Sequence, residues 1–320
     1  MTNPDRATHA PSTPHAADAA RASTTGDAPA TEPTSPRAGT PATGADLARQ
    51  IAVAVSAVLA VVGSFIGSGA AGGQRVQDAA GGALAADATL VAPGGGAFAI
   101  WSLIYFGLLA YAVWQFLPAQ RAEERHRRVG PWVAASMLLN AAWILSVQFD
   151  QLWLSVPVIA ALLVVLVMAF RITLRLRPAG TIDALITDGT IGLYLGWVCV
   201  ATIANIAAAL VAAGFDGFGL PPETWSVALV AVAGLLGIAL AVWDHGRIAP
   251  AITLSWGLAW IAVARLTDEP SSTVTGITAI IAVVAVLIST VAMRVVAMRR
   301  PGASRASGAP GASGRPSAAH

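Results

Sequence analysis

Eight stretches of roughly 20 residues each are apolar and almost free of charge. A helix that crosses a bilayer needs about 20 predominantly apolar residues, because its backbone polar groups must be hydrogen-bonded within the segment. None of the eight shows the alternation of polar and apolar residues that a membrane β-barrel requires. The sequence therefore predicts an all-α integral membrane protein with about eight transmembrane helices, at residues 49–69, 97–117, 131–149, 153–173, 186–212, 225–243, 248–265 and 273–296.

The two ends of the chain differ in composition from this apolar body. Residues 1–46 and 301–320 consist mostly of small and polar residues and carry almost no large apolar side chain. Such segments bury too little apolar surface to offset the entropy of ordering, so we predict two disordered tails. The first tail has no basic segment joined to an early apolar core, which argues against a cleaved signal peptide.

Arginine is distributed unequally over the connections between the apolar segments. Alternate connections hold few arginines and several carboxylates, whereas the arginine-rich ones lie at residues 121–128, 171–177, 247 and 294–300. Cytoplasmic loops of membrane proteins carry an excess of basic residues. We therefore expect a multi-pass protein of the plasma membrane with both termini in the cytoplasm.

Several residue types are too scarce for whole classes of chemistry. The chain has no lysine, so it can form neither a Schiff base nor the lysine contact of a phosphate-binding loop. Its single cysteine, Cys199, excludes disulfides, and His126 and His245 have no second histidine at ligand spacing, so we expect no metal site. A net charge of +2 without a clustered basic face argues against a nucleic-acid partner. No carboxylate lies at the centre of a span, which argues against an ion-coupled carrier.

Two asparagines, Asn140 and Asn205, lie within predicted spans. A buried amide must find a partner or line a cavity. The expected helix directions place these amides at one depth with Trp143 and with the aromatic residues near the start of the second helix, beneath a long Gly/Ala-rich loop at residues 70–96. Long loops are often functional lids. Two alternatives stay open: the loop is a spacer, or the amides only join packed helices.

Three further features carry weaker signals. The pairs Gly63 and Gly67, and Gly192 and Gly196, have the four-residue spacing that permits close helix contact. Acidic residues at 183 and 188 suit the N-terminal end of the fifth helix. The charged group at residues 244–247 is interpreted as a solvated cluster at the membrane interface.

Three short motifs occur in order along the second, third and fifth predicted helices. They read Phe98-Ala99-Ile100-Trp101-Ser102-Leu103-Ile104-Tyr105, Leu139-Asn140-Ala141-Ala142-Trp143, and Trp197-Val198-Cys199-Val200-Ala201-Thr202-Ile203-Ala204-Asn205. In these motifs the chain resembles the TspO/MBR family, the tryptophan-rich sensory proteins related to the mitochondrial translocator protein or peripheral benzodiazepine receptor. The chain departs from the family pattern at residues 94–96, where glycines replace a Trp and a Pro, and it lacks the Pro before the fifth-helix motif.

The resemblance implies an architecture. The family is a five-helix bundle, which we expect at residues 47–213 of this chain. The last three helices, at 214–300, are then expected to be a C-terminal membrane extension, as in enlarged bacterial relatives.

The resemblance also implies a bundle pocket that binds porphyrins or other hydrophobic ligands, often in a dimer, with a sensory or regulatory role. Trp and Tyr walls suit flat aromatic ligands, and a few amides would fix their orientation. No cofactor is required, although a porphyrin or haem-type molecule is an expected ligand; the expected partners are a hydrophobic small molecule, the lipid bilayer and a second copy of the chain. The expected ligand-binding residues are Phe98, Trp101, Tyr105, Asn140, Trp143, Trp197, Ala201 and Asn205.

Two other functions stay open at this point. One is a transporter of tetrapyrroles or other apolar metabolites, in which the last three helices help to form a path. The other is an intramembrane enzyme that degrades porphyrin. The spans hold no central cluster of His, Asp, Glu or Cys, so we expect a protein without enzymatic activity and with no catalytic residues.

Overall fold

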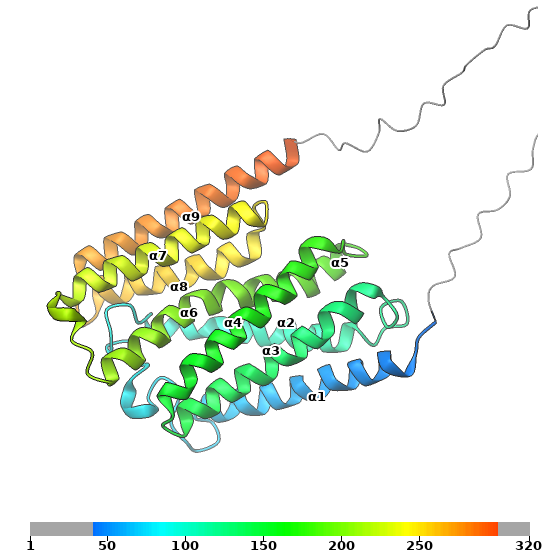
Figure 1. The fold of residues 1–320 in the computed structure, drawn as a ribbon, viewed down its shortest axis with the longest axis horizontal. Coiled ribbons are helices and arrows are strands. Elements are labelled where there is room, and N and C mark those ends of the chain that lie inside the picture. The colour runs from blue at the N-terminus through cyan, green and yellow to red at the C-terminus, as the bar shows by residue number, and fades with distance from the viewer. Residues whose placement is uncertain (1–40, 300–320) are drawn as a thin grey trace, which may run out of the picture. The chain divides into compact units, whose positions relative to one another are not determined.

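The computed structural model describes residues 41–299 (Figure 1). Most of the two predicted tails lies outside the described residues. The first helix, α1, begins at Gly44, so the predicted tail boundary at residue 46 is wrong by three residues. The reason is a capping box: the Thr43 hydroxyl accepts from the backbone N–H of Asp46, and the Asp46 carboxylate accepts from the backbone N–H of Thr43.

Within residues 41–299, eight helices are long and apolar enough to cross a membrane, which confirms the predicted fold class. Short turns precede two of them: the 3-10 turn η2 (Gly95–Ala99) precedes α2, and α5 (Thr181–Asp183) with the π-helical turn η3 (Ala184–Gly189) precedes α6. Two more 3-10 turns are η1 (Ala80–Gly82) and η4 (Gly217–Gly219). The long helices are α1 (Gly44–Gly67), α2 (Ile100–Trp114), α3 (Glu124–Gln148), α4 (Leu152–Arg175), α6 (Thr190–Ala212), α7 (Pro222–Trp243), α8 (Ile248–Thr267) and α9 (Thr273–Arg299).

Helix α3 begins seven residues before its predicted start at residue 131, because Arg125 in its first turn is buried and ion-paired. Arg125 donates to Asp183, with 2.8 Å between Nη1 and Oδ2, and it also pairs with Asp188. Arg247 reaches the same Asp188 from the turn between α7 and α8, with 3.1 Å between Nη1 and Oδ2. These contacts tie the starts of α3, α6 and α8 together.

The prediction of a solvated cluster at residues 244–247 is wrong for Asp244, because its exposed fraction is only 3%. Its Oδ1 accepts from the backbone N–H groups of Gly246 and Arg247, both at 2.9 Å. Burial raises the pKa of Asp244 to about 6. The carboxylate closes the turn after α7 and is not a free interface charge.

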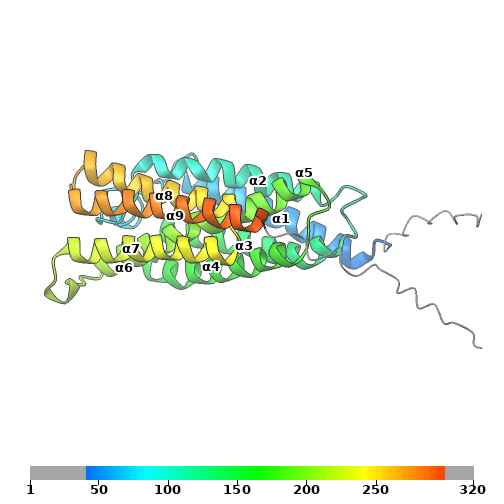
Figure 2. The ribbon, with the colours of Figure 1, turned by 90° about the horizontal axis from the view of Figure 1, so that it is seen from above.

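Helix α6 lies between two groups of helices. It packs against α4 on one side and α8 on the other; α8 in turn packs against α9, and α1 packs against α3 (Figures 1 and 2). Gly192 and Gly196 face α8 so closely that a Cβ added to Gly196 would lie 2.1 Å from the carbonyl oxygen of Pro250. A Cβ added to Gly63 would lie 3.3 Å from the Cβ of Ala141 on α3. Both small-residue pairs therefore support close helix contacts, as predicted.

Two apolar cores run along this arrangement. The first joins α1, α2, α3, α4 and the first half of α6. The second joins α7, α8 and α9 to the second half of α6, and it includes Val91 from the loop between α1 and α2. The predicted division of the chain at residue 213 stays a prediction.

Residues 68–94, which connect α1 and α2, are called the lid loop below. The loop packs on the helices, because Ala79, Val91 and Ala92 are buried. Ala79 belongs to the first core and Val91 to the second. A loop anchored in both cores is not a loose spacer.

Candidate functional site

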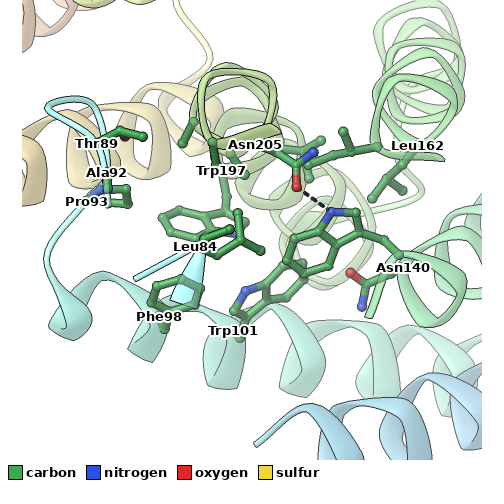
Figure 3. Close-up of a pocket in the computed structure, with 17 residues that line it drawn as sticks. Leu84, Thr89, Ala92, Pro93, Phe98, Trp101, Asn140, Leu162, Trp197 and Asn205 are labelled. Carbon is green, nitrogen blue, oxygen red and sulfur yellow. Dashed lines mark hydrogen bonds between the residues drawn. The ribbon is translucent and has the colours of Figure 1, made fainter. Parts of the chain in front are cut away.

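A cavity lies between the lid loop and helices α2, α3, α4 and α6 (Figure 3). Small and apolar side chains form most of its wall, and Trp and Asn side chains supply the rest. None of the described residues that line it is titratable, so the wall offers no acid or base for catalysis. The lining residues are Ala83, Leu84, Thr89, Ala92, Pro93, Phe98, Trp101, Asn140, Trp143, Ile159, Leu162, Trp197, Val198, Ala201, Ala204, Asn205 and Ala208.

The predicted ligand-binding residues come together at this cavity. The one that does not line it is Tyr105, which lies behind the wall, where its hydroxyl oxygen accepts from Nδ2 of Asn140 at 2.6 Å. That these residues bind a ligand remains a prediction. The seven that line the cavity are Phe98, Trp101, Asn140, Trp143, Trp197, Ala201 and Asn205.

Aromatic rings from α6 and from the start of α2 pack edge to face along one side of the cavity. The ring centroids of Trp101 and Trp197 are 6.2 Å apart with an interplanar angle of 81°, and Phe98 meets Trp197 at 6.0 Å and 73°. Trp101 also lies 5.6 Å from Tyr105. These contacts hold the rings in place, so the wall is formed before any ligand arrives.

Three helices are joined by a buried hydrogen-bond network centred on Asn205. Its Oδ1 accepts from Nε1 of Trp143 on α3 at 3.0 Å, and its Nδ2 donates to Oγ of Ser155 on α4 at 2.9 Å (Figure 3). Both ends of the amide are therefore satisfied within the protein. The alternative that the amide only joins packed helices is therefore sufficient to explain why Asn205 is buried.

Other polar atoms on the wall have no partner among the described residues. These buried atoms are Oδ1 of Asn140, Nε1 of Trp197 and Oγ1 of Thr89, and all three residues line the cavity. A buried polar group without a partner costs about 1–3 kcal/mol. The residues of the wall thus carry one unpaired amide acceptor, one unpaired indole donor and one unpaired hydroxyl that can do either.

The cavity is small, with a volume of about 40 Å³. A water molecule needs about 10–15 Å³ of such space, whereas sites for small organic ligands commonly have volumes of about 300–1,000 Å³. A porphyrin can enter only if the covering side chains move. Leu84, Thr89, Ala92 and Pro93 of the lid loop form that cover (Figure 3).

Several residues of the site were not predicted from the sequence. Ser155 holds Asn205, but its hydroxyl also donates to the carbonyl of Leu152 on the preceding turn at 2.6 Å, and such local bonds are ordinary for serine in a helix. Thr89 and Leu84 lie in a loop without periodicity, so no pattern marks them as wall residues. Ile159 and Leu162 look like any other apolar residues of a span.

A second, larger cavity of about 660 Å³ lies between the lid loop and the end of α6. It is called the outer cavity below. It shares Ala83, Thr89 and Ala208 with the first cavity, so the two adjoin. Its carboxylates are Asp78, which pairs with Arg75 at 2.7 Å, and Asp87.

Comparison with known proteins gives one match. A family model described as TSPO-like protein matches residues 50–292, which is more than half of the chain and includes α7, α8 and most of α9. The match therefore extends beyond Asn205, where the last of the three motifs ends, and beyond residue 213, the predicted end of the five-helix bundle. No curated protein and no solved structure matches.

Proposed function

The chain belongs to the TSPO-like family, and we propose that it is a membrane protein that binds a flat hydrophobic ligand of porphyrin type in the cavity beneath the lid loop. The role is sensory or regulatory and does not involve catalysis. The lipid bilayer is its environment, since eight helices in the described part of the chain are apolar and long enough to span one.

The observation that supports this proposal best is the set of unpaired polar atoms on an aromatic wall. Nε1 of Trp197 can donate to a carbonyl or carboxylate oxygen of a ligand, and Oδ1 of Asn140 can accept from a ring N–H. Such a pair distinguishes the two edges of a flat molecule stacked on Trp101. In the absence of ligand, the cost of leaving these atoms unpaired favours binding a molecule that pairs them.

The test is a titration of the reconstituted protein with protoporphyrin IX, read by tryptophan fluorescence. We expect saturable quenching in the wild type and a weaker affinity in the double variant Asn140→Leu, Trp197→Phe. The matched control is Trp153→Phe, which removes an indole that is 60% exposed and does not line the cavity. Unsaturable quenching, or the same affinity in the double variant and the control, contradicts the proposal.

A second candidate function is transport of an apolar metabolite. The observation that favours it is the outer cavity. This cavity adjoins the first cavity through Ala83, Thr89 and Ala208, so the two together give a ligand a route to the binding site. Uptake of protoporphyrin IX into proteoliposomes, above that of protein-free vesicles, distinguishes a transporter from a sensor. Binding without uptake leaves the sensor as the function.

A further inference from the structure

We propose that helix α8 is a latch for the lid loop, and that Arg265 is the positioning residue that holds the loop closed over the cavity. The part that concerns ligand exchange rests on the proposed function, whereas the part that concerns the loop itself does not.

Arg265 is buried and donates two hydrogen bonds to backbone carbonyls. Its side chain is 1% exposed, and its Nη2 donates to the carbonyl oxygen of Ala86, 179 positions earlier in the chain, at 2.7 Å. Its Nη1 donates to the carbonyl of Pro270 at 2.8 Å. None of the ion pairs among the described residues includes Arg265, so its hydrogen bonds go to carbonyls, while the carboxylates of Asp268, Asp87 and Glu269 attract its charge from further away.

Among the described residues, the loop around Ala86 makes no other hydrogen bond to a distant part of the chain. The backbone bonds of residues 77–93 run to neighbours three or four positions away, as from Ala85 to Gly82 and from Ala92 to Thr89. Within the part of the chain that the structure describes, the bond to Arg265 is the one hydrogen bond that ties residues 77–93 to another element. Apart from the apolar packing of Ala79 and Val91, the middle of the cover is therefore held by one guanidinium of α8.

Helix α8 also fixes the C-terminal end of the lid loop, so the middle of the loop can move while its end stays in place. The N–H of Gly94 donates to the carbonyl of Trp260 at 3.1 Å, and Nε1 of Trp256 donates to the carbonyl of Ala97 at 2.9 Å. A Cβ added to Gly96 would lie 2.2 Å from the Trp260 ring, so only glycine fits there. Glycines at residues 94–96, where the family pattern differs, let the chain lie against this helix.

The consequence is a coupling between the last three helices and the cavity. Helix α8 packs against α6 and α9, and α6 carries Trp197 and Asn205 on the cavity wall. Breaking the bond between Arg265 and Ala86 leaves the guanidinium with one carbonyl fewer, which opposes opening. Weakening the latch then speeds both entry and exit of a ligand.

The experiment measures lid opening by the reaction of a buried cysteine. Thr89→Cys, in a background with Cys199→Ala, replaces the buried hydroxyl of this loop residue by a thiol of similar size, and its labelling by a soluble maleimide is timed in nanodiscs. We expect Arg265→Gln to label about tenfold faster, since one charge-assisted hydrogen bond is lost. Arg265→Lys, which keeps the charge and can still donate, should restore part of the slow rate. Arg171→Gln is the matched control, because Arg171 is exposed on α4.

Size-exclusion profiles and melting curves verify folding, and Trp256→Phe, which weakens the base of the loop, replaces Arg265→Gln if that variant does not fold. Equal labelling rates in the latch variant and the control overturn the proposal. Faster labelling together with faster association and dissociation of protoporphyrin IX supports it. Faster labelling in a protein that binds no protoporphyrin also supports the latch, and it contradicts the proposed function instead.

Discussion

Two buried tryptophans on the cavity wall differ in one respect that a pair of substitutions can isolate. Trp143 and Trp197 are 7% and 2% exposed, and both line the cavity. The indole N–H of Trp143 donates to Asn205, whereas that of Trp197 has no partner among the described residues. Replacement of either residue by phenylalanine removes the same atoms.

The loss of ring volume costs each variant a similar amount, so the difference between the two variants reports the polar group. Trp143→Phe gives up one buried hydrogen bond, which is worth about 0.6–1.5 kcal/mol in a membrane protein. Trp197→Phe instead removes an unpaired donor, which relieves up to about 1–3 kcal/mol, or less where a water molecule occupies the cavity. We expect Trp197→Phe to be more stable than Trp143→Phe by about 2 kcal/mol.

The assay is unfolding of the purified protein by SDS titration in mixed micelles, with helical circular dichroism as the signal. The same two variants are then titrated with protoporphyrin IX. Trp197→Phe, although it is the more stable of the two, should bind about tenfold more weakly than the wild type, because about 1.4 kcal/mol corresponds to a factor of ten. If Trp197→Phe is as unstable as Trp143→Phe, the indole N–H has a protein partner and the reasoning about the wall is refuted.

Two further predictions concern stability. Since burial raises the pKa of Asp244 to about 6, against about 3.9 in the unfolded chain, the folded state binds more protons between these values, and the free energy of unfolding falls as pH rises from 4 to 6.5. Over that range the wild type should lose on the order of 2 kcal/mol of unfolding free energy, and Asp244→Asn should not lose it. Melting temperatures at both pH values measure this, and an equal fall in the variant and the wild type contradicts it. Gly196→Ala should lower the free energy of unfolding by about 1–3 kcal/mol, because its Cβ would meet the backbone of Pro250. Gly180→Ala is the control, because nothing lies within 4 Å of its Cβ. Equal melting temperatures of the two variants refute the close contact of α6 and α8.

The fold was largely predictable from the sequence, because apolar length alone identifies membrane helices. All eight predicted spans correspond to helices in the structure, and the errors lie at their polar ends. The cap at Thr43 could have been identified, since a threonine three residues before an acidic residue at the start of an apolar run is a known signal. The early start of α3 could not, because it depends on Asp183 and Asp188 some 60 residues later.

The site was predictable from the sequence only at residue types that are rare in membrane spans. Asn140 and Asn205 stand out because amides are costly in a span, and the motifs add the aromatic residues around them. The lid contacts were beyond reach, because Arg265 binds backbone carbonyls, and a carbonyl leaves no trace in the sequence. The arginine itself marked only a loop end.

The signals of the indole N–H groups test most directly whether a ligand binds at the cavity wall. The protein has ten tryptophans, so a spectrum of protein labelled with ¹⁵N in its indoles contains ten signals, which single Trp→Phe variants assign. On addition of protoporphyrin IX, we predict that the Trp197 signal moves as its N–H gains an acceptor, while that of the exposed Trp153 stays in place. A bound porphyrin that shifts Trp153 and leaves Trp197 unchanged would contradict ligand binding at the wall beneath the lid loop.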